Sequence, residues 1–317
     1  MRRILAIPAL VALFLLVACS TEADAQILDL HTTLYEHEAI LEAIPVELNP
    51  LVIDALTEYL VASGFEPRDA IIYRIRYISD AYEVIGYVAA PIDYFDHKYP
   101  ILIYNRGGNT EMIGMLTPEE VAMIAMGGYI VLASQYRGVA GGTGVEQFGG
   151  DDINDVLKLI DISEDFDFAR QGGVYMFGGS RGGMMTYIAS RLDDRIVAAA
   201  VWAAPTNLLE HFHERQSFYQ HVLITRIGGT PDELPDEYIR RSAIFWANEI
   251  MAPILIGHGG GADYRVATHH ATNMAEALER YGIPHRLSLH LQAGHDVIGT
   301  GFLHEVDEWF RQHPITD

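Results

Sequence analysis

The chain has 317 residues, of which 50% are apolar, 20% charged and 10% aromatic, with a single cysteine. This composition is typical of a globular protein and excludes a disordered, collagen-like or disulfide-stapled chain. Lys and Arg number 21 against 43 Asp and Glu, which gives a formal charge of −22. Such a charge repels nucleic acid and the anionic face of a bilayer, so neither is expected as a direct partner.

The first residues have the pattern of an export signal. Arg2 and Arg3 precede an apolar run over residues 4–18, which is too short for an ordinary membrane-spanning helix but fits the apolar core of a signal peptide. The run ends in Leu16-Val17-Ala18-Cys19, which resembles the lipobox of bacterial lipoproteins. The alternative is an ordinary signal peptide with a chance cysteine. We predict that residues 1–18 are a lipoprotein signal peptide and that a lipid on Cys19 anchors the exported protein to a membrane.

Residues 19–66 are expected to form a short helical extension, because apolar positions recur at helical spacing before a stop at Gly64. From there strand-like and helix-like stretches alternate, which predicts an α/β fold. We expect a mainly parallel eight-stranded sheet with helices on both faces and an antiparallel hairpin at its first edge. The expected strands lie near 70–78, 83–90, 100–105, 129–135, 173–178, 196–203, 252–258 and 285–291. The expected helices lie near 118–127, 152–162, 181–192, 266–282 and 302–312, and residues of about 205–250 form an insertion before the penultimate strand.

The segment Gly178-Gly179-Ser180-Arg181-Gly182-Gly183 lies between an apolar predicted strand and a predicted helix. This is the context of a nucleophile elbow, a strained turn that exposes a serine hydroxyl while the glycines permit close backbone approach. The alternative is a glycine-rich turn or phosphate cradle. However, neither a Gly-Lys-Ser/Thr Walker sequence nor a Gly-x-Gly-x-x-Gly sequence occurs at this turn. Ser180 is therefore the predicted nucleophile.

A serine nucleophile needs a base and an acid that orients it, and in this architecture they follow in the order Ser, Asp or Glu, His. His295 is the predicted base, because it lies on a loop directly after the last predicted strand. Asp263 follows the carboxyl end of a strand in a glycine-rich loop and is the predicted acid, although it could instead cap the next helix. The remaining late histidines, in a strand, in the last helix and near the chain end, are better explained as packed or solvated residues: His290, His304 and His313.

From about residue 70 onward the chain resembles the catalytic domain of the prolyl oligopeptidase family of serine peptidases, within the α/β-hydrolase fold. The resemblance rests on a series of motifs in order: Tyr136-Arg137-Gly138, Phe148-Gly149-Gly150-Asp151-Asp152 with Asp155, the Ser180 elbow, His258-Gly259 with Asp263-x-Arg265-Val266, and Gly294-His295. It implies that residues 67–317 form one catalytic domain that cleaves peptides through an acyl-enzyme. Ser180, Asp263 and His295 would then form the catalytic triad, and no cofactor is expected.

The oxyanion hole is expected from two backbone segments. One donor is the N–H of Arg181, and the other is an N–H of Gly107-Gly108, because the donors must be fixed where negative charge develops. The family often has an aromatic residue or histidine before this Gly-Gly, whereas this chain has Arg106. Two explanations of Arg106 remain open: it binds a substrate carboxylate, or it forms a surface ion pair with an acid.

Oligopeptidases of this family usually carry a β-propeller that restricts entry to short peptides, and residues 19–66 are too few for one. Substrate selection is therefore expected from the insertion. Its apolar and aromatic side chains suit either a lid with an acyl pocket or a simple cover for the sheet: Leu208, Leu209, Phe212, Phe218, Tyr219 and Tyr238.

No metal is expected. His211-x-His213 and His269-His270 have neither a nearby cysteine nor an HExxH pattern, and adjacent side chains on a helix diverge. The acids of residues 151–155 are interpreted as carboxylates that favour a helix start rather than as cation ligands.

The sequence thus predicts an exported serine hydrolase that acts on small peptides. A carboxylesterase is the alternative, favoured by the aromatic insertion. A third reading, a non-enzymatic binding module on a hydrolase scaffold, is disfavoured by the presence of all three triad residues.

Overall fold

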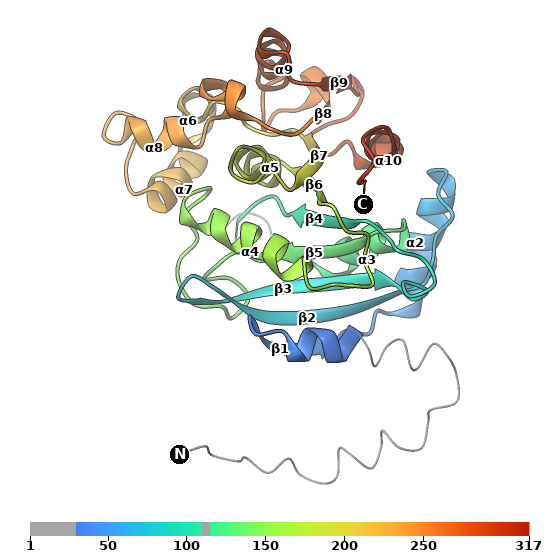
Figure 1. Ribbon diagram of the computed structural model, residues 1–317. Helices are drawn as coiled ribbons and strands as arrows, with labels where there is room; N and C mark the ends of the chain where they lie inside the picture. Colours follow the sequence, from blue (N-terminus) through green and yellow to red (C-terminus); the bar gives the residue numbers. More distant parts are fainter. Residues whose placement is uncertain (1–29, 110–114, 317) are drawn as a thin grey trace, which may run out of the picture.

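In the computed structural model, which describes residues 30–109 and 115–316, nine strands form one twisted sheet (Figure 1). The strand order is β1-β2-β3-β5-β4-β6-β7-β8-β9. The first four strands of this order pair antiparallel, and all pairs from β5 to β9 are parallel. The α/β-hydrolase fold and the antiparallel hairpin of β2 and β3, which the sequence predicts, are confirmed, but β1 rather than the hairpin forms the edge of the sheet.

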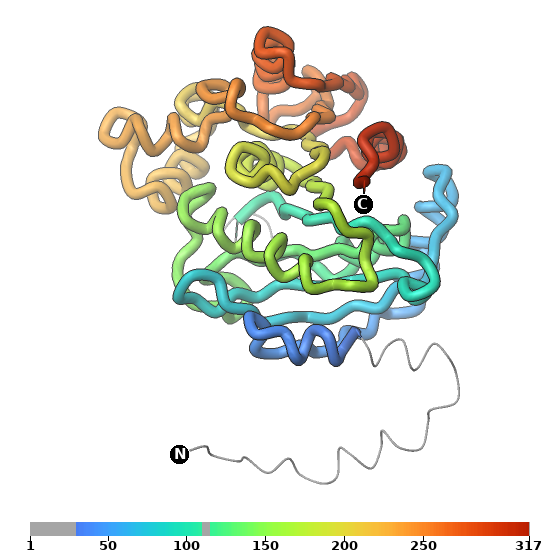
Figure 2. Tube along the Cα trace, in the orientation of Figure 1, coloured from blue at the N-terminus to red at the C-terminus, as the bar shows by residue number. Residues whose placement is uncertain are grey.

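The strands are β1 (Ile40–Pro45), β2 (Ala70–Ser79), β3 (Tyr82–Pro91), β4 (Ile101–Asn105), β5 (Ile130–Ser134), β6 (Val174–Gly179), β7 (Ile196–Trp202), β8 (Ile254–His258) and β9 (His285–Leu289). The helices are α2 (Pro50–Ala62), α3 (Pro118–Met126), α4 (Asn154–Ser163), α5 (Arg181–Leu192), α6 (Leu208–Glu214), α7 (Ser217–Ile227), α8 (Pro235–Arg240), α9 (His269–Tyr281) and α10 (Phe302–Gln312). Residues 30–36 are also helical. In the tube along the chain, β1 lies at one end of the sheet and β9, with α9 beside it, lies at the other (Figure 2).

Strand β1 corrects two expectations, because the sheet has nine strands rather than eight and the extension is not wholly helical. A bulge between Ile40 and Glu42 places two residues of β1 against one of β2. As a result Ile40 and Ala43, three residues apart, both face the core. This spacing does not alternate as a strand normally does, and the strand is held by hydrogen bonds to β2 that no local pattern encodes.

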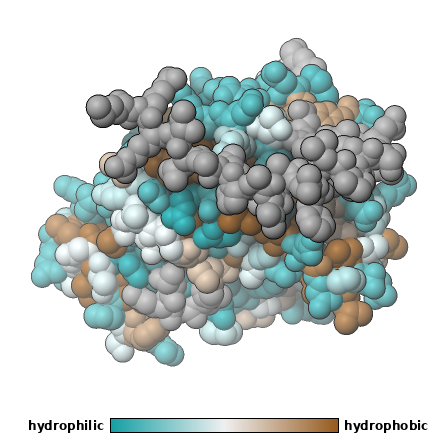
Figure 3. Space-filling view, turned by 90° about the horizontal axis from the view of Figure 1, so that it is seen from below, coloured by the Kyte–Doolittle hydropathy of each residue, from teal (hydrophilic) through white to brown (hydrophobic). Residues whose placement is uncertain are grey.

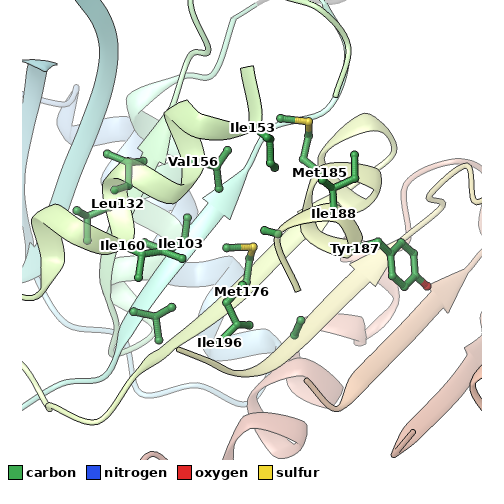
Figure 4. Packing of buried hydrophobic residues seen from close by; sticks show 14 of the residues in the cluster. Ile103, Leu132, Ile153, Val156, Ile160, Met176, Met185, Tyr187, Ile188 and Ile196 are labelled. Carbon is green, nitrogen blue, oxygen red and sulfur yellow. The ribbon is translucent and has the colours of Figure 1, made fainter. Parts of the chain in front are cut away.

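Helices cover both faces of the sheet and enclose two cores. One core holds α4, α5 and α9 with the insertion, and the other holds α3 and α10 with residues of α2 packed against it. In the first core, Val156 and Ile160 of α4 point at Ile103, Leu132 and Met176 of the central strands (Figure 4). The central strands are buried on both faces, which explains their nearly continuous apolar sequences.

Among residues 30–109 and 115–316 we find no helix with the length and apolar character needed to cross a bilayer. Seen from below, the described residues in view are a mixture of hydrophilic and hydrophobic ones (Figure 3). The predicted signal peptide and Cys19 lie outside the described residues.

Candidate active site

Ser180 lies at the turn from β6 to α5, at the carboxyl edge of the parallel strands. Its backbone has φ 55° and ψ −122°, a region that costs a non-glycine residue free energy and recurs at functional sites. The conformation is held at both sides, because the N–H of Ser180 donates to the carbonyl of Trp202 at 2.8 Å and its carbonyl accepts from Met184 at 3.1 Å. The predicted elbow is therefore present, and the surrounding sheet and helix maintain its strain.

The glycines around Ser180 are required by close packing. A Cβ on Gly179 would overlap the indole of Trp202, and a Cβ on Gly182 would overlap the carbonyl of Asn105. These contacts press the start of α5 against the ends of β4 and β7. The glycine pattern thus reflects the approach of three backbone segments at one turn.

Asp263 and His295 are joined by a hydrogen bond between Asp263 Oδ2 and His295 Nδ1 of 2.9 Å. Asp263 Oδ1 accepts from the backbone N–H groups of Arg265 at 2.7 Å and Val266 at 3.1 Å, so both carboxylate oxygens are occupied. Burial by itself raises the pKa of Asp263, but these hydrogen bonds outweigh burial and hold the pKa below its usual value. An ionised carboxylate therefore fixes the imidazole and leaves its Nε2 available.

Ser180 and His295 line the same cavity, so the structure brings all three predicted triad residues to one site. The loop of Asp263 can approach the loop of His295 because residue 259 is glycine: a Cβ there would overlap the carbonyls of Ala293 and Gly294. Asp263 does not act as a side-chain cap for α9, whose N-cap residue is Thr268. The geometry thus favours the acid over the capping alternative.

His258, at the end of β8, is a residue to which the sequence analysis gave no role. Its Nδ1 accepts from the N–H of Gly260 at 3.0 Å, so its proton lies on Nε2, which is 3.1 Å from the carbonyl of Val266 and 3.6 Å from Asp263 Oδ2. Burial lowers the pKa of His258, which makes the ring neutral at pH 7. His258 therefore positions the Asp263 loop. Its place in the motif His258-Gly259 was the only signal of this in the sequence.

The side chain of Arg181 is buried beneath the elbow. It donates to Glu146 and Asp152, each at 2.7 Å, and its guanidinium carbon lies 4.5 Å from the ring centre of Tyr136 and 5.0 Å from that of Phe148. Burial alone would lower the pKa of Arg181, but the two carboxylates raise it above the usual value, so the group stays charged. The motifs around Tyr136 and Phe148 therefore enclose the side chain of Arg181, the residue that follows Ser180.

The acids of residues 151–155 also have partners that the sequence analysis did not foresee. Asp152 accepts from the N–H groups of Gln147 and Gly149 as well as from Arg181, and Asp155 forms a buried ion pair with Arg137 at 2.7 Å. Their principal role is to hold loops and arginines in place. Interpreting them as helix-start carboxylates missed these partners, because they come from distant segments.

Arg106 is buried rather than exposed, so the explanation that it forms a surface ion pair is wrong. Its guanidinium donates to the carbonyls of Gln135 and Gly107 and to Glu146, and it stacks on Tyr136. These acceptors are all within the protein, which disfavours the substrate carboxylate as its partner. Arg106 instead fixes the Gly107-Gly108 segment beside the elbow, where Gly107 lies directly against Gly179 and Ser180.

Some residues of the insertion cover the core, and others line the cavity of Ser180. Leu208, Phe212 and Tyr238 are buried and cover the core, whereas Tyr219 lines the cavity of Ser180 together with Phe148. His211 and Arg215 of the insertion line the same cavity. One wall of the site is therefore built from residues 205–250.

The fold and this arrangement define a serine hydrolase of the α/β-hydrolase class. A model of the prolyl oligopeptidase family matches residues 116–313, and the chain belongs to this family.

Among its relatives is the uncharacterized peptidase YtmA of Bacillus subtilis (strain 168), which is 30% identical over 214 residues, or 67% of this chain and 81% of YtmA. The uncharacterized peptidase YuxL of the same organism is 28% identical over 233 residues, which are 68% of this chain and 35% of YuxL. Among solved structures, Pyrococcus horikoshii acylaminoacyl peptidase superposes with a TM-score of 0.66 at 20% identity, covering 81% of this chain and 44% of that one. At this identity the likeness shows the fold alone.

Proposed function

We propose that this serine peptidase cleaves short peptides through an acyl-enzyme, with Ser180 as nucleophile, His295 as general base and Asp263 as the orienting acid. The observation that carries the proposal is the 2.9 Å hydrogen bond from His295 Nδ1 to Asp263 Oδ2 at the cavity of the strained Ser180. Family membership supports the peptide as substrate.

In the first half-reaction Ser180 Oγ attacks the scissile carbonyl as His295 Nε2 takes its proton. The imidazolium that forms is stabilised by ionised Asp263, which also keeps the other ring proton on Nδ1. His295 then protonates the leaving amine, and water attacks the acyl-enzyme by the same route in reverse. No step in this sequence calls for a cofactor.

The proposed oxyanion hole is supported by two carbonyls with buried partners. The carbonyl of Arg106, which shares a peptide group with the N–H of Gly107, accepts from Tyr136 Oη at 3.0 Å, and the carbonyl of Gly107, which shares one with the N–H of Gly108, accepts from Arg106 Nη1 at 3.1 Å. In a trans peptide the N–H points opposite to the carbonyl, so the N–H groups of Gly107 and Gly108 point away from these buried partners. With the N–H of Arg181, which lacks a partner within the first turn of α5, they would receive the developing negative charge.

The test is a matched pair of initial rates, on short acyl-peptide amides and on simple acyl esters, with Ser180→Ala as the blank. His304→Gln is the control for His295→Gln, because His304 is exposed on α10. Serine-dependent amide cleavage supports the peptidase. Ester cleavage without amide cleavage would instead support a carboxylesterase, to which the aromatic wall of Phe148 and Tyr219 is also suited.

We also propose that the protein is exported and anchored by a lipid on Cys19. The support is the Arg2-Arg3 pair, the apolar run and the lipobox-like sequence ending at Cys19. Cys19→Ala is expected to move the protein from the detergent phase to the aqueous phase in a phase-separation assay and to abolish labelling by a radioactive fatty acid. Retention in the detergent phase by the variant would contradict the anchor.

A further inference from the structure

Three side chains from two distant segments meet beside the active-site cavity. His211 and Glu214 lie one turn apart on α6 of the insertion, and His270 lies in the first turn of α9. His270 Nε2 is 3.1 Å from Glu214 Oε2, and His211 Nδ1 is 3.8 Å from the same oxygen. One ligand atom from each residue lies within 4.8 Å of the other two.

Both imidazoles are buried, and that of His211 has a nitrogen without a hydrogen-bond partner. The side chain of His211 is 2% exposed, and its Nδ1 has no hydrogen-bond partner although it faces Glu214. A buried polar atom without a partner is destabilising, so this nitrogen calls for a ligand that the folded chain itself does not supply.

Two imidazoles and one carboxylate are a donor set that zinc accepts, with a fourth position left for water. At metal–ligand distances of about 2.0–2.2 Å, tetrahedral ligand atoms lie roughly 3.3–3.5 Å apart. Two of the observed separations, 3.1 and 3.8 Å, are close to this value. The backbone N–H of Thr206 donates to His270 Nδ1 at 3.3 Å, which holds the ring with its Nε2 towards Glu214.

We propose that His211, Glu214 and His270 bind one Zn²⁺ ion that joins the insertion to the catalytic core. The ion would link α6 to α9. Because the ring of His211 lines the cavity with Ser180 and His295, the bound ion would also fix this part of the cavity wall. The site lies apart from the triad and goes beyond the proposed function.

The sequence analysis expected no metal, because it compared His211 with His213 and His269 with His270. In the structure, His211 from the first pair and His270 from the second lie close together, and Glu214 completes the set. His211 and Glu214 share a face of α6 at i, i+3, but their approach to His270 depends on how the insertion packs against α9.

The experiment uses the Ser180→Ala protein, so that the result does not depend on turnover. The protein is freed of metal with a chelator, and binding of Zn²⁺ is measured by calorimetry and that of Co²⁺ by its visible absorption. We expect one Zn²⁺ per chain, an intense tetrahedral Co²⁺ spectrum and a rise in melting temperature with Zn²⁺. Failure of the proposed hydrolysis would leave these readouts unchanged, so the two proposals are tested separately.

Glu214→Gln is the main variant, because this partly exposed side chain can be replaced without opening the core, and His211→Ala is the second. The control is His213→Ala, an exposed histidine on the same helix that is not part of the set. Loss of an outer-shell partner weakens metal binding by about 10–100-fold, so loss of a ligand should weaken it at least about 100-fold. His213→Ala should bind as the parent does. Absence of stoichiometric Zn²⁺ binding, or equal binding by the parent and Glu214→Gln, would overturn the proposal.

Discussion

Arg181 and Asp152 form a 2.7 Å ion pair directly beneath the nucleophile turn, and both side chains are almost completely buried. The same guanidinium donates to the carbonyl of Gly108, across the elbow from Ser180. One arginine therefore connects the turn that carries the nucleophile with the segment proposed to complete the oxyanion hole.

Replacing Asp152 by Asn should weaken both folding and turnover. The change leaves the Arg181 charge buried with one carboxylate fewer, and breaking a buried ion pair costs about 3–5 kcal/mol. Urea unfolding should show this loss, and kcat should fall because the guanidinium that donates to the Gly108 carbonyl is then held by one carboxylate fewer. The matched control is Asp151→Asn, since Asp151 adjoins Asp152 but its side chain is exposed. Equal stability of the two variants would contradict a structural role for the pair.

Replacing Asp263 by Asn should lower kcat by roughly four orders of magnitude, because the amide no longer fixes the His295 tautomer or stabilises the imidazolium. Initial rates of the purified variant on an acyl-peptide amide measure this loss. A fall of less than about tenfold would remove Asp263 from the proposed triad.

The same substitution should change the pH dependence of stability. The pKa of Asp263 is lowered in the folded protein, so its ionised form contributes stability that is complete above the usual value of 3.8 and is lost as the pH falls below 3.8 through the lowered pKa. The difference in unfolding free energy between parent and variant should therefore shrink on acidification below pH 3.8. Urea titrations at a series of pH values measure it. A difference that grows in acid would contradict the sign of this shift.

Replacing Gly179 by Ala should destabilise the protein, because the new Cβ meets the Trp202 ring at the centre of the sheet. We expect a cost at the upper end of the about 1–3 kcal/mol typical of overpacking. Gly299→Ala is the control, since a Cβ there has open space. Thermal unfolding of both variants tests the expectation, and equal melting temperatures would show that the close approach is not needed.

Replacing Tyr219 by Ala should raise KM for substrates with a bulky acyl side, because its ring forms part of the wall beside Ser180. The adjacent Phe218 is 59% exposed, so Phe218→Ala should leave KM unchanged. Comparing substrates with small and large acyl groups separates a lost pocket wall from a general loss of activity. A uniform fall in kcat with no change in KM would point away from a role in substrate selection.

The sequence predicted the elements that local chemistry defines. The helix expected near 118–127 forms as α3, which begins with a capping box of Thr117 and Glu120, and the glycine-flanked Ser180 lies on the expected strand-to-helix turn. Asp263 and His295 were found because each follows the carboxyl end of a parallel strand, where loops converge.

The features that the sequence did not predict depend on contacts between distant segments. The partners of Arg181 lie 29 and 35 residues away, and the signal for Arg106 was ambiguous because a buried and an exposed arginine look alike in a sequence. Strand β1 was missed because its bulge removes the alternation that marks a strand. The His211, Glu214 and His270 set likewise exists only once the insertion has packed on α9.

The most direct test of the central claim is covalent labelling by a serine-directed fluorophosphonate, followed by mass spectrometry of the digested protein. The account predicts one adduct per chain on Ser180, no adduct in Ser180→Ala, and much slower labelling of His295→Gln than of His304→Gln. An unlabelled protein, or an adduct on another residue that persists in Ser180→Ala, would contradict it.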